Sequence, residues 1–598
     1  MNQRHSYLGG WSLAWRFLLL LINVLPITQA IQNLNRTQTS AKPNIVIVLI
    51  DDMGFNDVSF HGSNQFLTPN IDALAYNGII LNKHYVPNLC TPSRATLLTG
   101  KYPIHTGMQH FVIINDEPWG LPLEERLMPE IFRDAGYSTN LVGKWHLGFY
   151  EKEMTPTFRG FDHHYGYYSG YISYYDHTNK MANNFTGMDF RDDLRPMPEV
   201  NGIYATDLFT EESVRIIKDH DASTPLFLML SHLAVHTGNE DNPMEFPPEE
   251  LENFDHIKDP KRRAYAAMVS RLDQSVGETI AALSEKGILN NTIILLYSDN
   301  GAPTVGIHSN AGSNHPFRGQ KESPWEGGIR SAGLIWSPLL QQQSYVSNQM
   351  AHAIDWLPTL AAAADVKLPY DLQIDGVNLW PSLNQGSDPQ PRRLLHVFDD
   401  VFGYSSYTRG NLKYVNGSSF DGQYDSWLGD IAFEESDPMA NFYEQHVLSS
   451  QVHKTLGNPK LSIEQIQRLR AESTHKCPFN AEDFTQDIYK CEPLRAPCFF
   501  NIDKDPCERY NLANLYPLQI QFLAQEVEEY RMTARPSVRI AHGDPLSNPQ
   551  RFGGVWQWWQ NTEMAGFRGA GATPKAIGLS VLLCLFCVIA VYVKKTFN

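Results

Sequence analysis

Residues 44–50 read Asn-Ile-Val-Ile-Val-Leu-Ile, and Asp51 and Asp52 follow them directly. A run of aliphatic and mostly β-branched residues is typical of a strand buried inside a parallel sheet. Further strands are predicted at residues 138–142, 226–230, 292–297 and 333–336. The stretch therefore indicates a sheet in the interior of the protein.

Patterns typical of helices lie between the predicted strands. Thr68 suits an N-cap, Pro69 the first turn and Gly78 the end of one helix. Further helices are predicted at residues 124–135, 206–220 and 260–286. Since helices and buried strands alternate, the expected fold class is α/β, with a mostly parallel sheet flanked by helices.

The alternating pattern weakens after about residue 379. Residues 381–393 are rich in Pro, Gln, Ser and Asp, which is typical of a linker. Hairpin-like segments, four cysteines and a helix at about residues 518–532 follow. We therefore expect a large first domain at residues 42–380 and a smaller C-terminal α+β domain at residues 394–536.

Both ends of the chain carry apolar runs. Arginines precede the run at 17–25, and small residues at 28–30 offer a cleavage site, so residues 1–30 are predicted to be a signal peptide. An uncleaved signal anchor is the alternative. Residues 576–593 are apolar and two lysines follow them, which favours a transmembrane helix after a juxtamembrane segment at 537–575. A glycolipid-anchor signal is the alternative there.

The net charge and the glycosylation sequons limit the possible partners and the cellular compartment. The 598 residues carry a formal net charge of -17, which argues against nucleic acid as a partner. N-x-S/T sites that fit glycosylation on the secretory route occur at Asn35, Asn184, Asn290 and Asn416. A membrane-anchored protein with a luminal or extracellular body is therefore expected.

The secretory route is oxidising, so disulfides are expected in the C-terminal part. The four cysteines there are Cys477, Cys491, Cys498 and Cys507. Three pairings are possible, and the sequence does not choose among them. We favour neighbour pairing, with Cys477 bonded to Cys491 and Cys498 to Cys507.

Polar side chains follow two predicted strands where the strands end. Asp51 and Asp52 follow the first, and Asp299 and Asn300 follow the strand at 292–297. In an open parallel sheet, ligands bind beyond the carboxyl ends of the strands. Three carboxylates and an amide suit a hard cation such as Ca²⁺ or Mg²⁺, and the lack of His or Cys argues against zinc. A single pair of such polar residues would be interpreted as part of a turn or a helix cap. Two pairs, each at the end of a buried strand, indicate a metal site instead.

Cys90 lies far from the other cysteines and begins the run Cys-Thr-Pro-Ser-Arg. Pro92 and Ser93 suit a helix start, and Gly100 suits its end. The start of a helix attracts anions, and Arg94 can turn toward the same point. Cys90 is therefore either a buried, inert thiol or a nucleophile beside an anion site, although an exposed thiol does not suit an oxidising route.

The run from Cys90 to Arg94, with Thr99 and Gly100, resembles the signature of the type I sulfatases. Residues 43–54, 143–148, 298–301 and 317–328 resemble further motifs of that family, and residues 498–513 are similar to a second-domain motif of arylsulfatases B, I and J. The resemblance extends over about residues 42–559. It implies an alkaline-phosphatase-like fold with a sulfatase catalytic domain at 42–380.

The resemblance also implies the cofactors. A formylglycine-generating enzyme of the endoplasmic reticulum would oxidise Cys90 to Cα-formylglycine, whose hydrate attacks sulfur. One Ca²⁺ per active site would activate that hydroxyl and polarise the sulfate. The implied metal ligands are Asp51, Asp52, the modified Cys90, Asp299 and Asn300.

The remaining site residues are cationic or titratable. The resemblance implies that Lys144, His236 and Lys321 bind the sulfate oxygens, with His236 protonating the leaving alcohol. His146 would deprotonate the second hydroxyl so that sulfate is expelled, and Arg94 would hold the diol and the helix start. His232 competes with His236 for its role.

Several nearby residues are open to two interpretations. His315 and Arg318 would either support the site or lie in loops. A tyrosine-rich segment would either border a sugar site or pack against the body; its residues are Tyr165, Tyr167, Tyr168, Tyr171, Tyr174, Tyr175 and His177.

The leading hypothesis is a sulfuric ester hydrolase acting on sulfated sugars such as N-acetylgalactosamine 4-sulfate in glycosaminoglycans, in the lysosome or at the cell surface. One alternative is a phosphoesterase or phosphotransferase of the alkaline-phosphatase superfamily, which would use Ser or Thr and two zinc ions. The other is a membrane-anchored glycan-binding pseudoenzyme, which would not need every polar residue of the site.

Overall fold

The computed structural model describes residues 42–181, 183–387, 391–429, 436–457, 461–477 and 487–560. The predicted signal peptide, Asn35 and the apolar segment 576–593 lie outside these residues. Within the described part of the chain, no helix is both long and apolar enough to span a bilayer. Of the predicted glycosylation sites, Asn184 and Asn290 are exposed and Asn416 is half-buried.

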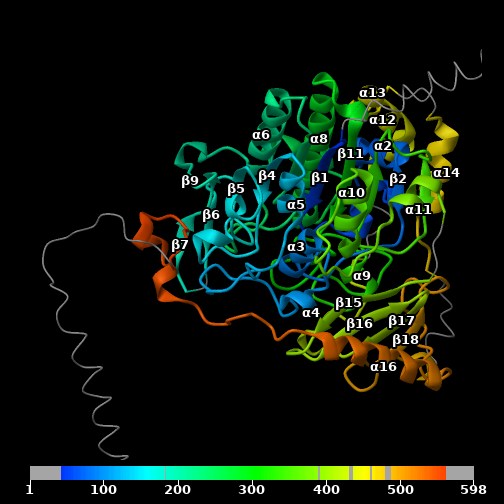
Figure 1. The fold of residues 1–598 in the computed structure, drawn as a ribbon. Coiled ribbons are helices and arrows are strands. Elements are labelled where there is room, and N and C mark those ends of the chain that lie inside the picture. Colours follow the sequence, from blue (N-terminus) through cyan, green and yellow to red (C-terminus); the bar gives the residue numbers. More distant parts are fainter. Residues whose placement is uncertain are drawn as a thin grey trace, which may run out of the picture. The chain divides into compact units, whose positions relative to one another are not determined.

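A large mixed sheet forms the centre of the fold (Figure 1), with the strand order β13-β2-β12-β11-β1-β10-β4-β5-β8-β9 among the described residues. Its middle strands run parallel, from β11 through β1, β10 and β4 to β5, whereas β12 and β8 run antiparallel to their neighbours. The strands are β1 (Asn44–Ile50), β2 (Ile79–Leu81), β4 (Ser138–Lys144), β5 (His163–Tyr167), β8 (Arg191–Asp192), β9 (Arg195–Pro196), β10 (Leu226–Ser231), β11 (Thr292–Ser298), β12 (Gly333–Trp336) and β13 (Tyr345–Ser347). The predicted α/β class with a mostly parallel sheet is confirmed.

Strand β1 is covered on both faces. Its residues Val46 and Val48 belong to one apolar cluster, and Ile45 and Ile47 belong to a second. Because successive side chains of a strand point to opposite faces, the two clusters lie on opposite sides of the sheet. The first cluster includes α2 (Pro69–Asn77), α6 (Ala205–Asp219) and α8 (Pro260–Glu285), and the second includes α3 (Cys90–Thr99), α5 (Met128–Asp134) and α10 (Trp356–Ala363).

Helix α5 is shorter than predicted. It begins at Met128 rather than at residue 124. Leu127 is the N-cap, Pro129 lies in the first turn, and the Glu130 carboxylate accepts a hydrogen bond from the Leu127 amide at 2.7 Å. This arrangement defines a helix start that the residue pattern did not reveal.

A separate four-stranded antiparallel sheet follows, as expected for the smaller C-terminal part. Its strands are β15 (Arg393–Asp399), β16 (Tyr404–Arg409), β17 (Leu412–Asn416) and β18 (Cys498–Asn501), and helix α16 (Pro517–Thr533) packs against it. The chain between β17 and β18 returns to the large sheet. Helices α12 (Tyr443–Ser449), α13 (Gln451–Leu456) and α14 (Ile463–Ser473) there share the apolar cluster of α2 and α8.

The described part of the predicted juxtamembrane segment packs on the protein. Residues after α16 run past α4 (Pro103–Thr106) and end beside β7 (Thr186–Met188), in orange to red in Figure 1. The Val538 amide donates to the Gly107 carbonyl at 2.9 Å, and the Trp556 ring is fully buried, with its Nε1 donating to the Asn179 carbonyl at 3.1 Å. These contacts attach residues 538–559 to the part of the protein that contains the large sheet.

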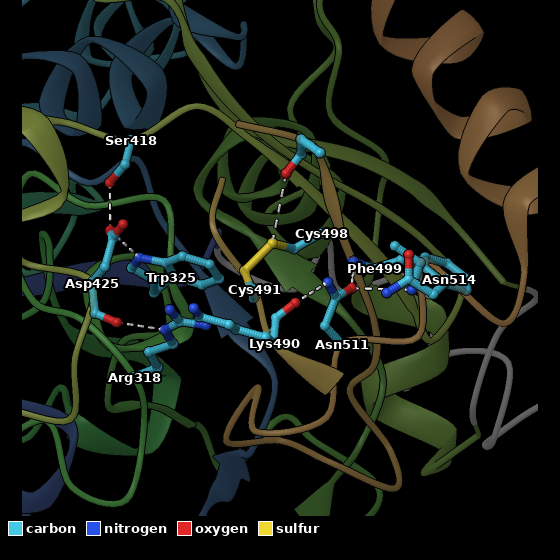
Figure 2. The surroundings of a disulfide bond; sticks show 12 residues. Arg318, Trp325, Ser418, Asp425, Lys490, Cys491, Cys498, Phe499, Asn511 and Asn514 are labelled. Carbon is cyan, nitrogen blue, oxygen red and sulfur yellow. Dashed lines mark hydrogen bonds between the residues drawn. A yellow bond between two sulfur atoms is a disulfide. The ribbon is translucent and has the colours of Figure 1, made fainter. Parts of the chain in front are cut away.

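The predicted disulfide pairing is wrong. Cys477 bonds to Cys507 and Cys491 to Cys498, with Cα–Cα distances of 5.7 Å in both pairs. Cys491 and Cys498 close a short loop just before β18 (Figure 2). Cys477 instead follows α14, so its bond to Cys507 joins the end of that helix to the turn after β18. Linear spacing does not report this return of the chain between two sheets.

Candidate active site

Helix α3 places Cys90 at the carboxyl edge of the central strands. The helix begins at Cys90 and ends at Gly100, whose φ of 67° is the left-handed conformation that glycine readily adopts. Cys90 is only 3% exposed and is the free cysteine among the described residues. Burial raises the pKa of its thiol, which outweighs the opposite effect of Lys144 and Lys321. An unmodified Cys90 is therefore a poor thiolate nucleophile.

Three buried carboxylates meet beside this helix start. Asp51 and Asp52 follow β1, and Asp299 follows the neighbouring strand β11. Oxygen atoms of these three residues lie within 4.8 Å of one another. The Asp299 Oδ1 also accepts from the Asp52 amide at 3.3 Å, and Asn300 Nδ2 donates to Asp52 Oδ1 at 2.6 Å. The four predicted oxygen ligands are thus brought together.

Three cations neutralise the carboxylates. Lys144 Nζ lies 2.6 Å from Asp51 Oδ2, and Lys321 Nζ lies 2.6 and 2.8 Å from the two Asp52 oxygens. Arg94 Nη2 lies 2.8 Å from Asp299 Oδ2. The neighbouring carboxylates raise the pKa of Lys321 against the opposing effect of burial. For Asp299, burial and the Asp51 charge raise the pKa, and Arg94 opposes them.

The cluster retains free acceptor atoms. Asp51 Oδ1 and Asn300 Oδ1 are buried and accept no hydrogen bond from any described residue, although Arg94 Nη2 lies 3.7 Å from Asp51 Oδ1. A buried, unsatisfied oxygen is costly unless a ligand supplies the missing interaction. Oxygen atoms of carboxylates and an amide are what Ca²⁺ and Mg²⁺ bind, so this set fits a hard divalent cation.

His146 lies at the end of β4 with one nitrogen fixed. Its Nε2 lies 3.0 Å from the Ile113 carbonyl oxygen, which only accepts, so Nε2 carries the proton. Nδ1 is left without a partner among the described residues. Burial, with Lys144 adding to it, lowers the pKa of His146 well below its usual value. The neutral ring therefore presents a free lone pair on Nδ1, as a general base requires.

The structure brings His236, and not His232, to the carboxylates. His236 Nε2 lies 3.5 Å from Asp52 Oδ2, and its Nδ1 lies 2.6 Å from the Thr237 carbonyl oxygen. Backbone hydrogen bonds of 2.8 and 3.1 Å between Asp51 and residues 234–235 hold this segment against β1. His232 is fully buried on the far side, where its Nε2 lies 3.2 Å from Ser275 Oγ of α8.

Arg94 also contacts a residue that the sequence did not reveal. Its Nη1 donates to Ser231 Oγ at 2.6 Å, and its Nε and Nη2 both donate to Asp299 Oδ2. Ser231 ends β10, the strand beside β1. A serine at a strand end carries no distinctive pattern, which explains why it was not predicted.

His308 is a second unpredicted neighbour of the site. Its ring centroid lies 5.6 Å from that of His236 and 4.8 Å from that of Tyr171, and Tyr171 stacks on His236 at 5.6 Å. His308 lies in the Gly- and Asn-bearing loop after Asn300, and that composition was the available signal.

Most of the tyrosine-rich segment packs against the body. Tyr171 and Tyr174 contact His236, the latter through a hydrogen bond of 2.8 Å from its hydroxyl to the His236 carbonyl. The side chains of Tyr165, Tyr167, Tyr168 and His177 are buried, and Tyr175 is half-buried. Tyr171 alone in this group stacks on a predicted site residue.

Arg318 lies between the two sheets rather than at the carboxylates. Its guanidinium lies 3.7 Å from the Trp325 ring centroid, and its Nε donates to the Asp425 carbonyl at 2.6 Å (Figure 2). The Asp425 carboxylate in turn accepts from Trp325 Nε1 at 2.6 Å and from Ser418. His315 lies in the same loop, where its amide donates to Ser313 Oγ at 3.3 Å.

A buried ion network supports the segment that carries Lys321. Lys413 of β17 lies 2.9 Å from Glu326 and 2.7 Å from Glu508, and all three side chains are fully buried. Glu326 begins the short helix α9 (Glu326–Ile329), five residues after Lys321. Burial raises the pKa of Glu508 to about 7, whereas Lys413 and Arg330 lower the pKa of Glu326 despite burial.

Comparison with known proteins agrees with this site. The family model described as Sulfatase matches residues 43–366. Arylsulfatase J of Mus musculus is 37% identical over 530 residues, which cover 88% of this chain and 82% of that protein. N-acetylgalactosamine-6-sulfatase of Rattus norvegicus is 32% identical over 405 residues, covering 65% of this chain and 72% of that protein. The crystal structure of Ps i-CgsB has the same fold, with a TM-score of 0.64, 24% identity, and coverage of 83% of this chain and 94% of that one.

Proposed function

The chain belongs to the sulfatase family, and on that premise we propose that this sulfuric ester hydrolase uses Ca²⁺ and a formylglycine at residue 90 to hydrolyse sulfate esters of sugars. The observation that carries the proposal is the meeting of three buried carboxylates, three cations and Cys90 at one helix start. Family membership speaks against the phosphoesterase alternative, and the buried carboxylate group contains no histidine that would suit a pair of zinc ions.

In this proposal the cation is held by Asp51, Asp52, Asp299 and Asn300, together with residue 90. The free oxygens on Asp51 and Asn300 support that assignment. A bound Ca²⁺ would polarise the sulfate and lower the pKa of an attacking hydroxyl, and a hydrated aldehyde at residue 90 would supply that hydroxyl. The raised pKa of the Cys90 thiol supports a modified residue over a thiolate.

The remaining residues act on the sulfate and on protons. Lys144 and Lys321 would stabilise negative charge on the sulfate oxygens, because both ammonium groups already lie at the carboxylate cluster. Burial and the neighbouring lysines lower the pKa of His236, and its Nδ1 donates to the Thr237 carbonyl, so the ring is neutral and Nε2 carries no proton without an anion beside it. A bound sulfate ester would favour the imidazolium form, whose Nε2 would hydrogen-bond the sulfate and pass its proton to the leaving alcohol. His146 would accept a proton at Nδ1, the atom left free by the Ile113 carbonyl. Arg94 would fix the helix start against Asp299 and Ser231.

A sulfated N-acetylhexosamine, such as N-acetylgalactosamine 4-sulfate, is the proposed substrate class. A relative at 32% identity is an N-acetylgalactosamine-6-sulfatase, and Tyr171 offers a ring beside His236 on which a sugar can stack. The predicted secretory route is supported by two disulfides and by exposed sequons at Asn184 and Asn290. Membrane anchoring, in the lysosome or at the cell surface, remains a prediction.

The decisive test is mass spectrometry of the tryptic peptide that ends at Arg94, from the full chain made in a secretory host. We expect an aldehyde at residue 90 and hydrolysis of a small aryl sulfate. A Cys90→Ala variant should be folded but inactive, because no attacking hydroxyl can form. An intact thiol in an active enzyme, or turnover by Cys90→Ala, would contradict the mechanism.

A further inference from the structure

His308 turns inward from an exposed loop and lies beside the proposed proton donor. Its ring centroid lies 5.6 Å from that of His236 and 4.8 Å from that of Tyr171. Two other side chains of the same loop face outward, since Val305 and Ile307 are 39% and 66% exposed. The His308 imidazole, which is half-buried, therefore extends from the loop tip toward the candidate active site.

Hydrogen bonds to the backbone and side chains of the site hold this loop in place. The Val305 amide donates to Gln320 Oε1 at 3.0 Å, and Gln320 Nε2 donates to the Val305 carbonyl at 2.9 Å. At the other end of the loop, Asn310 Nδ2 donates to the Asp52 carbonyl at 2.9 Å and to the Val235 carbonyl at 3.0 Å. The loop is thus attached to the same backbone that carries the carboxylate cluster, so its tip is positioned before a ligand binds.

One nitrogen of the His308 ring is paired and the other is not. Nδ1 lies 3.3 Å from Thr237 Oγ1, which is the one hydrogen bond that the ring makes with the described residues. Burial lowers the pKa of His308 to about 4, and the charges of Lys321 and Lys144 act in the same direction. The ring is therefore neutral at neutral pH. Its Nε2, on the edge of the ring away from Nδ1, can donate or accept a hydrogen bond according to the tautomer.

We propose that His308 is a specificity-determining residue, whose Nε2 hydrogen-bonds a hydroxyl of the sugar that carries the sulfate ester. The inference rests on the proposed function and deepens it. In that function the sulfate lies at the carboxylate cluster and His236 protonates the leaving oxygen. The sugar attached to that oxygen therefore lies beside His236, where His308 offers its unpaired nitrogen.

A hydroxyl is the group that fits a neutral imidazole in this place. A sugar hydroxyl both donates and accepts hydrogen bonds, so it can pair with either tautomer of His308. An aryl sulfate has no hydroxyl next to its ester and would leave Nε2 without a partner. A site with a placed polar group discriminates against an analogue that lacks the matching group. His308 should therefore favour sulfated sugars over aryl sulfates.

The test measures kcat/KM of the full-length enzyme for 4-nitrophenyl sulfate and for the faster of N-acetylgalactosamine 4-sulfate and 6-sulfate. In His308→Asn we expect the ratio of the sugar value to the aryl value to fall about five- to tenfold, through a higher KM for the sugar. Asparagine tolerates the left-handed backbone of residue 308, whose φ is 54°, and its amide can keep the contact with Thr237. It is too short, however, to reach the position of Nε2.

Two further variants control for the chemistry and for the loss of an imidazole. His308→Gln places an amide near the position of Nε2 and should keep part of the preference for the sugar. His542→Asn changes an exposed imidazole and should leave both kcat/KM values as in the wild type.

The outcomes separate this inference from the proposed function. A wild-type enzyme that hydrolyses neither kind of substrate would contradict the proposed function itself. Activity on the aryl sulfate alone would rule out both the sugar substrate class and the His308 contact. A wild-type enzyme that hydrolyses both would leave the proposed function intact. The contact would then be refuted by an unchanged ratio in His308→Asn, or by equal losses for the two substrates, because equal losses indicate a distorted site.

Discussion

At the scale of single residues, Arg94 has the most connected side chain of the site. Its guanidinium donates to Asp299 through Nε and Nη2 and to Ser231 through Nη1, and it is 1% exposed. A planar group with several fixed donors can satisfy two partners at once, which a lysine ammonium cannot do with the same geometry. Arg94 therefore positions Asp299 and the start of α3 together.

We expect Arg94→Lys to lower kcat/KM for aryl sulfates by about 100-fold, because Asp299 loses its paired donors and moves. Metal analysis of the purified variant should show less bound Ca²⁺ than the wild type. Arg133→Lys, at an exposed position on α5, provides the matched control. Wild-type activity and metal content in Arg94→Lys would show that the guanidinium geometry is not required.

At the scale of elements, α14 is attached to the first part of the chain through His61. The His61 Nδ1 donates to the Ser473 carbonyl at 2.9 Å, and the His61 ring stacks on Phe55 at 3.7 Å. Burial lowers the pKa of His61 to about 3, and Arg330 acts in the same direction. The folded state therefore holds this ring neutral at pH values where the unfolded chain binds a proton.

This contact makes stability fall in acid. Since the folded pKa is about 3 and the unfolded value is 6.5, the contribution is complete above pH 6.5 and is lost as the pH falls toward 3. Between pH 7 and pH 5, one such histidine reduces the free energy of unfolding by about 2 kcal/mol. His61→Gln should make the difference in unfolding free energy between these two pH values smaller by about that amount.

Urea unfolding of both proteins at pH 7 and pH 5 measures the effect. The compared quantity is the difference in unfolding free energy between the two pH values, so any loss of stability common to both pH values cancels. His542→Gln, which changes an exposed imidazole, serves as the control and should leave the difference as in the wild type. An unchanged difference in His61→Gln would mean that the ring does not stay neutral in the folded state.

A helix or strand could be predicted where a single local sequence pattern determines it. Residues 44–50 form β1 with the bounds that their sequence indicated, because a run of β-branched residues strongly favours a strand. The start of α5 was not predictable from the pattern, since it depends on the Glu130 side chain reaching back to the Leu127 amide. The disulfides depend on where α14 returns, and spacing along the chain does not encode that.

The site was predictable where strand ends decide it. Asp51, Asp52, Asp299 and Asn300 meet because β1 and β11 are parallel neighbours. His308 was missed because it lies in an irregular loop with a positive φ value, where only the folded backbone determines the direction of a side chain. Residue type and periodicity carry no signal for such positions.

At the scale of the whole molecule, the Lys413 network joins the smaller sheet to the segment that carries Lys321. Lys413 belongs to β17, whereas Glu326 begins α9 near Lys321, and Glu508 follows β18. All three charges are withdrawn from water, so each depends on the others. Through this network the smaller sheet helps to hold the segment that carries Lys321.

Lys413→Met should destabilise the protein by about 3–5 kcal/mol, because it leaves two buried carboxylates without their shared cation. Thermal unfolding measures the loss, with Lys454→Met at an exposed position of α13 as the control. Adding Glu508→Gln to Lys413→Met should restore part of the stability, since one buried negative charge is then removed. A single variant as stable as the wild type would show that the network does not support the fold.

The equal numbers of acidic and cationic side chains at the carboxylate cluster have a consequence for the order in which ligands arrive. Asp51, Asp52 and Asp299 are balanced by Arg94, Lys144 and Lys321, so the centre is electrically neutral before it is loaded. A divalent ion in the proposed site leaves a local excess of positive charge on a protein whose net charge is -17. If the proposed cation binds, the loaded centre would attract an anionic ester to a protein of negative net charge, and cation binding would then precede substrate binding.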